Sequence, residues 1–434
     1  MKSFTLSIQH LLAMYAGAIL VPLIVGGSIG LNAEQLTYLV AIDILMCGVA
    51  TILQVMQNRV FGIGLPVVLG CTFTAVGPII HIAGEYGISA VYGAIITSGL
   101  FVILISGFFG KLVRFFPPVV TGCVVTIIGI TLIPVAINNM GGGEGAPDFG
   151  SFTNIALSFG TLFMIIAIYR FSTGFMRAIS ILIGLIIGTI VASFFGLVDF
   201  QNVKDASYVH MVVPFYFGVP TFHWSAIITM ILVAIVSLVE STGVYFALGD
   251  MTERDLKKND LTRGYRAEGI AIVFGGIFNA FPYTAFSQNV GLMQITGVKS
   301  RKVIFITGVM LVVLGFVPKL AAITTIIPTA VLGGAMLAMF GMVVAQGIKM
   351  LSGVIVESSE NAMIIACSVG MGLGVTVAPE LFAQFPSSIQ ILTSNGIVAG
   401  SFTAIILNII FNMIPKKEKV SETTKIEEKE TYVS

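Results

Sequence analysis

The sequence predicts an all-α polytopic membrane protein with 14 transmembrane segments, arranged as a 7+7 inverted repeat. Three observations predict this fold. Hydrophobic residues make up 56% of the 434 residues and charged residues only 10%, whereas soluble domains carry about 25% charged residues. Long apolar runs recur along the whole chain, and two interrupted runs occupy matching places in its halves. The composition excludes a soluble enzyme, a disordered protein and a nucleic-acid-binding protein.

Apolar runs of roughly 20 residues can cross the hydrocarbon core of a bilayer as helices. The first run begins near Leu6 and ends near Gly27; it is longer than a signal-peptide core, and no small-residue cleavage site follows it. Helices are expected rather than barrel strands, because the runs do not alternate between apolar and polar residues. The further predicted segments are residues 36–56, 66–82, 88–108, 117–137, 154–169, 177–198, 224–249, 265–281, 283–297, 303–318, 326–347, 359–378 and 395–413.

The distribution of basic residues supports this count. If the N-terminus faces the cytoplasm, 20 of the 22 Lys and Arg residues fall on the cytoplasmic side, and only Lys204 and Lys319 fall outside. An error of one segment would remove this bias. The sequence therefore predicts a multi-pass protein of the plasma membrane with both termini in the cytoplasm. A charged, disordered tail is expected over residues 415–434.

Two segments interrupt the helical pattern. Residues 62–78 and residues 282–297 are apolar but rich in Gly, Pro, Thr and Ser, and both are too short for a complete span. Each belongs to the third segment of a set of seven, and because seven is odd, the second set is inverted relative to the first. Interrupted segments at matching places in two inverted repeats indicate a substrate site between them. The alternative is a pair of re-entrant loops that serve packing alone.

Few ionisable side chains lie within the predicted segments, where a charge costs at least about 2.5–3.5 kcal/mol. Glu240 is a candidate ligand acceptor or proton carrier, and the alternative is a structural carboxylate bonded to neighbouring helix ends. Glu268 begins the ninth segment, where an interfacial ion pair with Arg263 or Arg266 is the rival to a functional role. Asp43 in the second segment is expected to be a structural or interdomain group.

The dipeptide Gln288–Asn289 in the second interrupted segment is the most specific polar feature. A side-chain amide offers a donor and an acceptor in one plane, which complements adjacent N–H and C=O groups on a planar ring. Such a ligand suits the site better than an inorganic ion, and the alternative is an amide pair that satisfies local carbonyls. His10, at the start of the first segment, is a candidate proton shuttle, or a histidine that ties this segment to a neighbour.

The remaining chemistry-bearing residues indicate no enzyme and no cofactor. No HExxH, GxSxG or catalytic aspartate pair occurs within the segments. The cysteines lie in apolar runs without CxxC spacing or a nearby histidine, and we expect buried thiols that form neither disulfides nor metal sites. These cysteines are Cys47, Cys71, Cys123 and Cys367.

The residues around the amide dipeptide resemble the signature of the nucleobase–ascorbate transporter family, also called nucleobase:cation symporter 2. That signature is Gln/Glu-Asn-x-Gly, followed after four positions by Thr and a variable residue. The resemblance covers about residues 5–413, and the combination of its elements is highly specific. The matching residues are Gln288, Asn289, Gly291, Thr296 and Gly297 of the signature, Gln9 and His10 of the first segment, Glu240 of the eighth and Glu268 of the ninth.

The resemblance implies a fold with a core domain and a gate domain, and short antiparallel strands in the broken segments 3 and 10. It assigns residues 1–108 and 223–320 to the core domain, and residues 109–222 and 321–414 to the gate domain. It also implies proton-coupled uptake by a homodimer in the lipid bilayer.

The resemblance further implies roles for individual residues. Glu240 and Gln288 are expected to bond a base, with Asn289 supporting Gln288. The other expected site residues are Phe73, Phe286 and Ser287 beside the base, and Glu268, His10 and Asp43, with Glu240, in the proton-coupling and conformational network.

The amide of Gln288 favours a purine substrate. Uracil permeases resemble this chain but carry Glu at this place, and a carboxylate only accepts where an amide also donates to a purine carbonyl. The flanking segments are most similar to bacterial xanthine permeases, so we expect proton-coupled import of xanthine. Urate is the main alternative, ahead of an anion exchanger or channel with the same architecture and of a uracil carrier. At Val244 several relatives carry Asp or His, which leaves the coupling route open.

Overall fold

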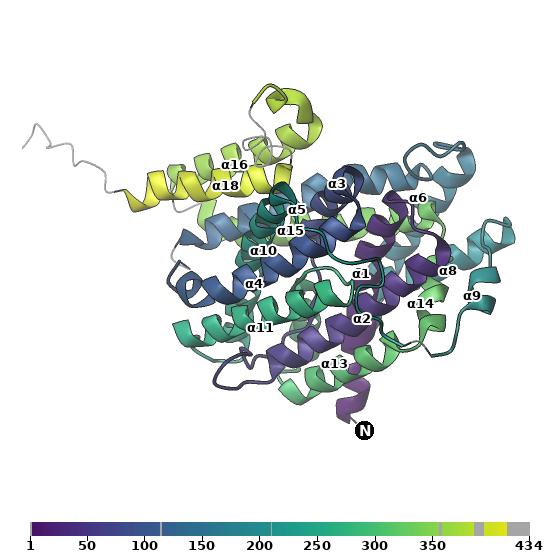
Figure 1. Cartoon of the computed structure of the whole chain (residues 1–434), viewed down its shortest axis with the longest axis horizontal. Helices are drawn as coiled ribbons and strands as arrows, with labels where there is room; N and C mark the ends of the chain where they lie inside the picture. The colour runs from purple at the N-terminus through teal and green to yellow at the C-terminus, as the bar shows by residue number, and fades with distance from the viewer. Residues whose placement is uncertain (1, 113–114, 210, 356–357, 386–394, 415–434) are drawn as a thin grey trace, which may run out of the picture.

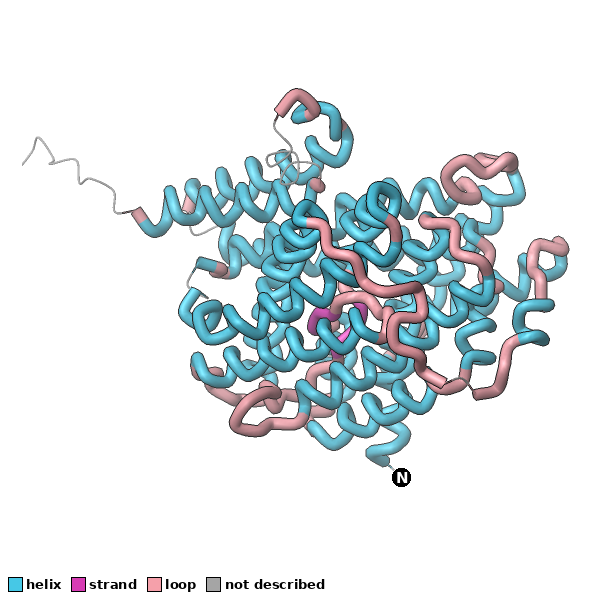
Figure 2. The backbone as a smooth tube through the Cα atoms, in the orientation of Figure 1, coloured by secondary structure: helices cyan, strands magenta, loops and turns pink. Residues whose placement is uncertain are grey.

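The computed structural model describes residues 2–112, 115–209, 211–355, 358–385 and 395–414. The predicted tail, residues 415–434, lies outside the described residues. Within them the chain forms one bundle of long helices (Figure 1). Two short strands lie inside this bundle, surrounded by helices (Figure 2).

The helices follow one another through the two halves of the chain, with short pieces between long ones. The first half contains α1 (Lys2–Ser28), α2 (Ala33–Val55), β1 (Leu69–Cys71), η1 (Phe73–Ala75), α3 (Val76–Tyr86), α4 (Ile88–Leu112), α5 (Pro118–Met140), α6 (Phe152–Phe171), α7 (Gly174–Ala178), α8 (Ser180–Phe194) and α9 (Gln201–Asp205). The second half contains α10 (Trp224–Met251), α11 (Lys258–Ile277), β2 (Tyr283–Ala285), α12 (Ser287–Thr296), α13 (Arg301–Gly315), α14 (Pro318–Thr325), α15 (Thr329–Ile355), α16 (Ser359–Val377), η3 (Pro379–Phe382), α18 (Gly396–Asn408) and η4 (Ile409–Met413).

The helices support an integral membrane protein but do not by themselves give the predicted count of spans. Among the described residues, nine helices are long and apolar enough to cross a membrane, or ten if the bent pair α13 and α14 counts as one. That pair bends by 81° at its break. Of the four other predicted segments, three contain short helices, since α3 has 11 residues, α8 has 15 and α12 has 10. The fourth contains α11, which has 20 residues but is not among the helices apolar enough to span. The count of 14 therefore stays a prediction.

The helices pack in two groups. In the first group α2 packs against α13, α4 packs against α11 and α10, and α1 packs against α2 and α13. In the second group α5 packs against α15, α16 and α18, and α6 packs against α8 and α15. Contacts of α1 with α8 and α15, and of α10 with α5, join the two groups. The strands belong to the first group, because β1 packs against α2 and β2 packs against α10.

The same close helix crossing occurs twice in the first group. Where α2 crosses α13, a Cβ atom added to Gly48 would lie 2.6 Å from the carbonyl oxygen of Gly308. Where α4 crosses α11, a Cβ atom added to Gly99 would lie 2.9 Å from the carbonyl oxygen of Gly269. Small residues allow helix backbones to approach this closely in a membrane. Each crossing joins a helix of the first half to a helix of the second half. The earlier helix of the first half, α2, crosses the later helix of the second, α13, and the later helix, α4, crosses the earlier one, α11.

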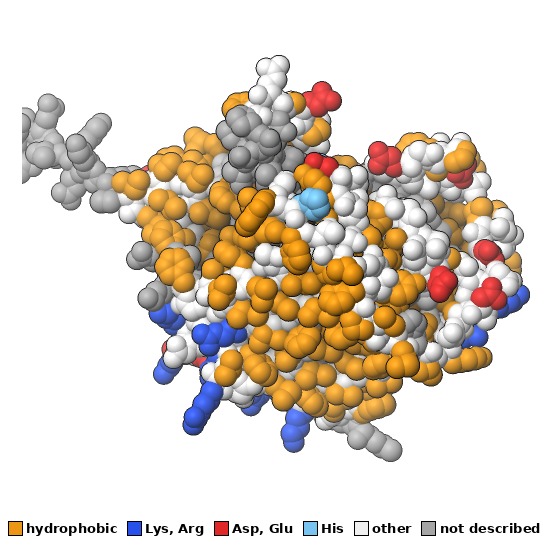
Figure 3. Space-filling view, in the orientation of Figure 1, with side chains coloured by type: hydrophobic (Ala, Val, Ile, Leu, Met, Phe, Trp, Pro, Cys, Tyr) orange, Lys and Arg blue, Asp and Glu red, His pale blue; other side chains and the backbone are white. Residues whose placement is uncertain are grey.

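The surface is apolar over most of its middle. In the view of Figure 3, hydrophobic side chains cover the centre of the molecule, Lys and Arg gather mainly at the lower left, and Asp and Glu lie toward the upper and right edges. Large apolar side chains such as Leu104, Phe163 and Phe194 are 82%, 65% and 84% exposed. An apolar surface of this extent is unfavourable in water and is expected of a protein embedded in lipid.

The cysteines were predicted to be buried, and this is wrong for one of them. Cys47, Cys71 and Cys123 are buried free thiols, whereas Cys367 on α16 is exposed. An apolar run in a membrane helix can face lipid as well as protein, so the run around Cys367 did not require burial. The Sγ atoms of Cys47 and Cys71 lie 3.9 Å apart and are not bonded.

Candidate functional site

The two interrupted segments meet through their strands. β1 and β2 pair antiparallel, with Gly70 opposite Thr284 at the centre of the register. The pairing extends beyond the strands, because the N–H of Phe286 donates to the carbonyl of Val68 at 2.9 Å. Figure 2 shows this small sheet enclosed by helices. Segments more than 200 residues apart thus bring the starts of α3 and α12 to one place.

Hydroxyl groups hold the strands against α10. The Oγ of Ser241 lies 3.1 Å from the Oγ1 of Thr284 and accepts a hydrogen bond from the N–H of Ala285 at 3.0 Å. The Oγ1 of Thr72 lies 3.3 Å from the Oγ of Ser237. These contacts satisfy strand groups that the two-stranded sheet leaves open. They fix α10, which carries Glu240, beside the sheet.

Glu240 lies on α10 between these serines and a small cavity. One of its carboxylate oxygens is buried and has no hydrogen-bond partner within the part of the chain that the structure describes. The cavity has a volume of about 120 Å³ and is also lined by Val244 and Ser287. A buried acceptor without a partner is unfavourable unless a ligand or a proton completes it. Glu240 therefore has a carboxylate oxygen that can accept a hydrogen bond from a ligand.

Gln288 lines a second cavity, of about 350 Å³. Ser287, Gly291, Gln346 and Lys349 line both cavities, so the two are neighbours. The first turn of α12 has no side-chain cap. Its backbone N–H groups, which no carbonyl within the helix can satisfy, are available to an acceptor on a ligand.

Phe286 directly follows β2, and Phe73 begins η1 just after β1. Their ring centroids are 6.4 Å apart, and Phe73 also meets Phe340 of α15 edge-on at 5.5 Å. The Phe286 ring lies in a slot between Gly17 of α1 and Gly70 of β1, where a Cβ atom on either glycine would overlap it. The two glycines thus determine where Phe286 lies.

Asn289 points away from Gln288 and towards α1. Its Nδ2 donates to the backbone carbonyl of His10 at 3.2 Å and lies 3.3 Å from the Nδ1 of the same residue. Both side chains are buried. This contact ties α12 to the first helix, which is the bonded role considered for His10, while support of Gln288 by Asn289 stays a prediction.

Glu268 is fully buried on α11 and belongs to a hydrogen-bonded chain. The hydroxyl of Tyr245 on α10 donates to the Glu268 carboxylate. The side-chain amide of Gln54 on α2 donates to the same hydroxyl, at 2.5 Å, and to the carbonyl of Gly264 at 2.8 Å. This chain joins α2, α10 and α11 close to Glu240.

The rival interpretation of Glu268, an ion pair at the interface, is wrong. Arg263 pairs with Asp260 instead. Arg266 donates to the Oγ of Ser106 on α4 at 3.1 Å. The segment was predicted to begin at residue 265, but α11 begins at Lys258. Glu268 therefore lies about three turns inside the helix, and each arginine has a different partner.

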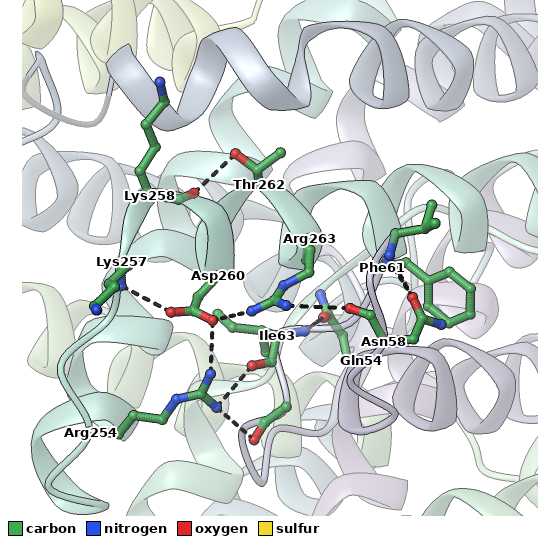
Figure 4. Close-up of polar contacts among 12 residues, drawn as sticks. Gln54, Asn58, Phe61, Ile63, Arg254, Lys257, Lys258, Asp260, Thr262 and Arg263 are labelled. Atoms are coloured by element: carbon green, nitrogen blue, oxygen red, sulfur yellow. Dashed lines mark hydrogen bonds and ion pairs between the residues drawn. The ribbon is translucent and has the colours of Figure 1, made fainter.

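A polar cluster fixes the loop that leads into the first interrupted segment (Figure 4). Arg254 donates to the carbonyls of Ile63 and Gly64, each at 3.1 Å, and pairs with Asp260 at 2.9 Å. Arg263 pairs with the same carboxylate oxygen. The connection between α10 and α11 is thereby bonded to the backbone a few residues before β1. Charge-assisted bonds of this kind are stronger than neutral ones.

Asp43 on α2 is a buried acceptor for the second interrupted segment. Its Oδ1 accepts a hydrogen bond from the N–H of Phe281 at 2.7 Å, just before β2. Neither cavity described above is lined by Asp43. This geometry favours the structural interpretation of Asp43.

Asp43→Leu is expected to lower the free energy of unfolding by about 1–3 kcal/mol, because it leaves the buried N–H of Phe281 unpaired. Asp43→Asn retains the acceptor and is expected to keep both stability and transport. Thermal unfolding in detergent and substrate uptake measure the two effects. Loss of uptake in Asp43→Asn at unchanged stability would instead place Asp43 in proton coupling.

Sequence reasoning missed several residues at this site. Gln346 and Lys349 line both cavities, and Arg177 of α7 lines the larger one. Gln346 gave a usable signal, since it is an amide inside the otherwise apolar segment 326–347. Gln54 gave the same kind of signal, as an amide in the apolar segment 36–56, whereas Tyr245 gave none, because its pairing depends on contacts between distant helices. Among the described residues, no group of three or more His, Cys, Asp or Glu side chains is placed to hold a metal ion.

The family model and the relatives in sequence agree on one family. The family model Xan_ur_permease, a permease family, matches residues 1–381. The chain is 66% identical to the xanthine permease of Bacillus subtilis (strain 168) over 432 residues, which cover 100% of this chain and 99% of that protein. It is 63% identical to the uric acid permease PucK of the same organism over 406 residues, 94% of each.

A solved structure shares the fold. The transmembrane domain of the cyanobacterial bicarbonate transporter BicA matches with a TM-score of 0.63, at 16% identity, over 90% of this chain and 97% of that one. At this identity the likeness concerns the fold alone.

Proposed function

Because the chain belongs to the permease family of nucleobase–ascorbate transporters, we propose that it is a secondary transporter that imports a purine base, xanthine, together with a proton. It is a membrane permease for nucleobases and not an enzyme. The observation that carries the proposal is the unpartnered carboxylate oxygen of Glu240 beside the uncapped first turn of α12.

The proposed architecture is 14 segments in two inverted repeats of seven, with segments 3 and 10 broken. The recurring glycine crossings support it, since α2 with α13 and α4 with α11 are segments 2 with 11 and 4 with 9. Exchange of the two repeats converts one crossing into the other. In this proposal the first packing group is the core domain, residues 1–108 and 223–320, and the second is the gate domain, residues 109–222 and 321–414.

In the proposed binding mode a purine lies at the ends of the two interrupted segments. Glu240 accepts hydrogen bonds from ring N–H groups, and the amide of Gln288 pairs with an adjacent N–H and C=O edge. The N–H groups at the start of α12, from Ser287 onwards, donate hydrogen bonds to a ring carbonyl. Phe73 and Phe286 pack against the ring, at the positions that their mutual contact and the Gly17–Gly70 slot support.

Proton coupling is proposed to act through Glu240 and Glu268. A protonated Glu240 removes the penalty of a buried charge when the core domain moves against the gate domain and the site closes. The hydrogen bond from the Tyr245 hydroxyl to Glu268 supports Glu268 as a second carboxyl group in this network. Glu268 would replace the Asp or His that several relatives carry at the position of Val244. His10 and Asp43 hold α12 and β2 in register with the core.

The proposed assembly is a homodimer in the plasma membrane with both termini in the cytoplasm. The basic loops support this orientation, because Arg254, Lys257 and Arg263 lie together at the end of α10 and the start of α11 (Figure 4). Positive residues near helix ends are retained on the cytoplasmic side.

Xanthine is proposed over urate because the relative with the higher identity of the two compared is a xanthine permease. The test is uptake of radiolabelled xanthine in cells that lack their own purine permeases, with unlabelled urate, guanine, hypoxanthine and uracil as competitors. We expect saturable uptake that xanthine itself competes best and that an uncoupler abolishes. Stronger competition by urate changes the substrate, and no uptake by a protein shown to be in the membrane contradicts the purine site.

A further inference from the structure

The two cavities beside α12 carry an unusual balance of charge. Among the described residues that line them, the only charged side chains are Glu240, Arg177 and Lys349. The guanidinium of Arg177 lies 4.0 Å from the centroid of the Tyr169 ring, a cation–π contact that leaves its charge unneutralised. No carboxylate in the described part of the chain pairs with Arg177 or Lys349.

The two cations lie on the gate side of the cavities. Lys349 is on α15 and Arg177 on α7, whereas Glu240 is on α10 of the first packing group. A concave site with apolar walls focuses the field of such charges and raises the local concentration of an oppositely charged solute. The larger cavity, at about 350 Å³, is within the size range of small-molecule sites. The amide of Gln346, one helical turn before Lys349, adds a donor and an acceptor at the shared wall.

We propose that Arg177, Gln346 and Lys349 form an exit station that takes the purine as its monoanion after it leaves Glu240. This inference rests on the proposed function. An oxopurine with two or more ring carbonyls loses a ring proton near neutral pH, so xanthine and urate exist partly or largely as anions in the cytoplasm. An anion is repelled by an ionised Glu240 and attracted by Lys349 and Arg177. The charge pattern therefore draws acidic oxopurines out of the central site and discriminates against bases that stay neutral.

The test measures the KM for xanthine from the cytoplasmic face, in inside-out membrane vesicles, for the wild type and Lys349→Gln. In alkaline buffer, where xanthine is an anion, Lys349→Gln is expected to raise this KM about fivefold to tenfold. In acidic buffer, where xanthine is neutral, we expect the two KM values to agree. Arg177→Gln is expected to act in the same direction, and Lys349→Arg, which keeps the charge, to restore the wild-type value.

Lys302→Gln is the matched control, since Lys302 is an exposed lysine at the start of α13 that lines neither cavity. An equal KM change in Lys302→Gln, or an equal change for Lys349→Gln in both buffers, would overturn the exit station. An active Lys349→Gln with no KM change would do the same. These outcomes require purine flux in the wild type; its absence contradicts the proposed function itself, and the station with it.

Discussion

Glu240→Gln is expected to abolish accumulation of xanthine against its gradient. Glutamine keeps the size and an acceptor oxygen, but it cannot take up and release a proton, so any residual flux only equilibrates the base across the membrane. Loss of a charge-assisted hydrogen bond to the ligand is also expected to weaken binding roughly 10-fold to 100-fold, as a loss of about 1.5–3 kcal/mol requires. Xanthine binding to the purified protein and uptake into proteoliposomes with an imposed pH gradient measure the two effects.

Glu253→Gln is the control for this variant. Glu253 is an exposed glutamate in the connection between α10 and α11, where it pairs with Lys299 at 3.1 Å. Exposed pairs of this kind contribute at most about 1 kcal/mol, so binding and accumulation are expected to stay at the wild-type level. Accumulation that persists in Glu240→Gln would show that another group, with Glu268 first among them, carries the proton.

Gly70→Ala is expected to disrupt the substrate site as strongly as loss of a side chain that touches the base. A Cβ atom at this place overlaps the Phe286 ring, and the ring has no room to retreat because Gly17 closes the opposite side of its slot. Forcing a methyl group into such a packed site costs about 1–3 kcal/mol. We expect Phe286 and the first turn of α12 to shift, with at least a tenfold rise in the KM for xanthine or loss of uptake.

Gly84→Ala separates this effect from a general intolerance of substitution. Gly84 lies on α3, the helix that follows the strand of Gly70, and an added Cβ atom there meets no other atom within 4 Å. Uptake by Gly84→Ala is expected to equal that of the wild type, at equal protein levels in the membrane. Wild-type uptake by Gly70→Ala would contradict the placement of Phe286 at the base.

The sequence predicted the interrupted segments because their composition differs from that of a plain span. Gly, Pro, Thr and Ser in residues 62–78 and 282–297 indicated a break in the helical pattern, and the strands β1 and β2 lie within these ranges. No sequence pattern indicated the hydrogen-bond partners of that backbone. The N–H of Phe281 donates to Asp43, which is 238 residues away in the sequence. The side-chain amide of Asn289 donates to His10, which is 279 residues away.

Helix ends were predicted less well than helix interiors, and one site residue was misjudged for this reason. α11 begins seven residues before its predicted start, because a polar first turn with Asp260 looks like a loop in sequence. This turn is helical since Asp260 accepts from the N–H of Lys257 and pairs with Arg254. The shift puts Glu268 inside the core, where Tyr245 bonds it. Tyr245 itself had no signal among the apolar residues of its helix.

Proton coupling is tested by the accumulation of xanthine in proteoliposomes that contain the wild-type protein. We expect that an alkaline interior drives xanthine above its external concentration, that an uncoupler releases it, and that a sodium gradient of equal size does not replace the pH gradient. Accumulation that follows sodium and ignores the pH gradient would contradict proton coupling. Flux of bicarbonate, chloride or sulfate without flux of xanthine would contradict the purine carrier as a whole.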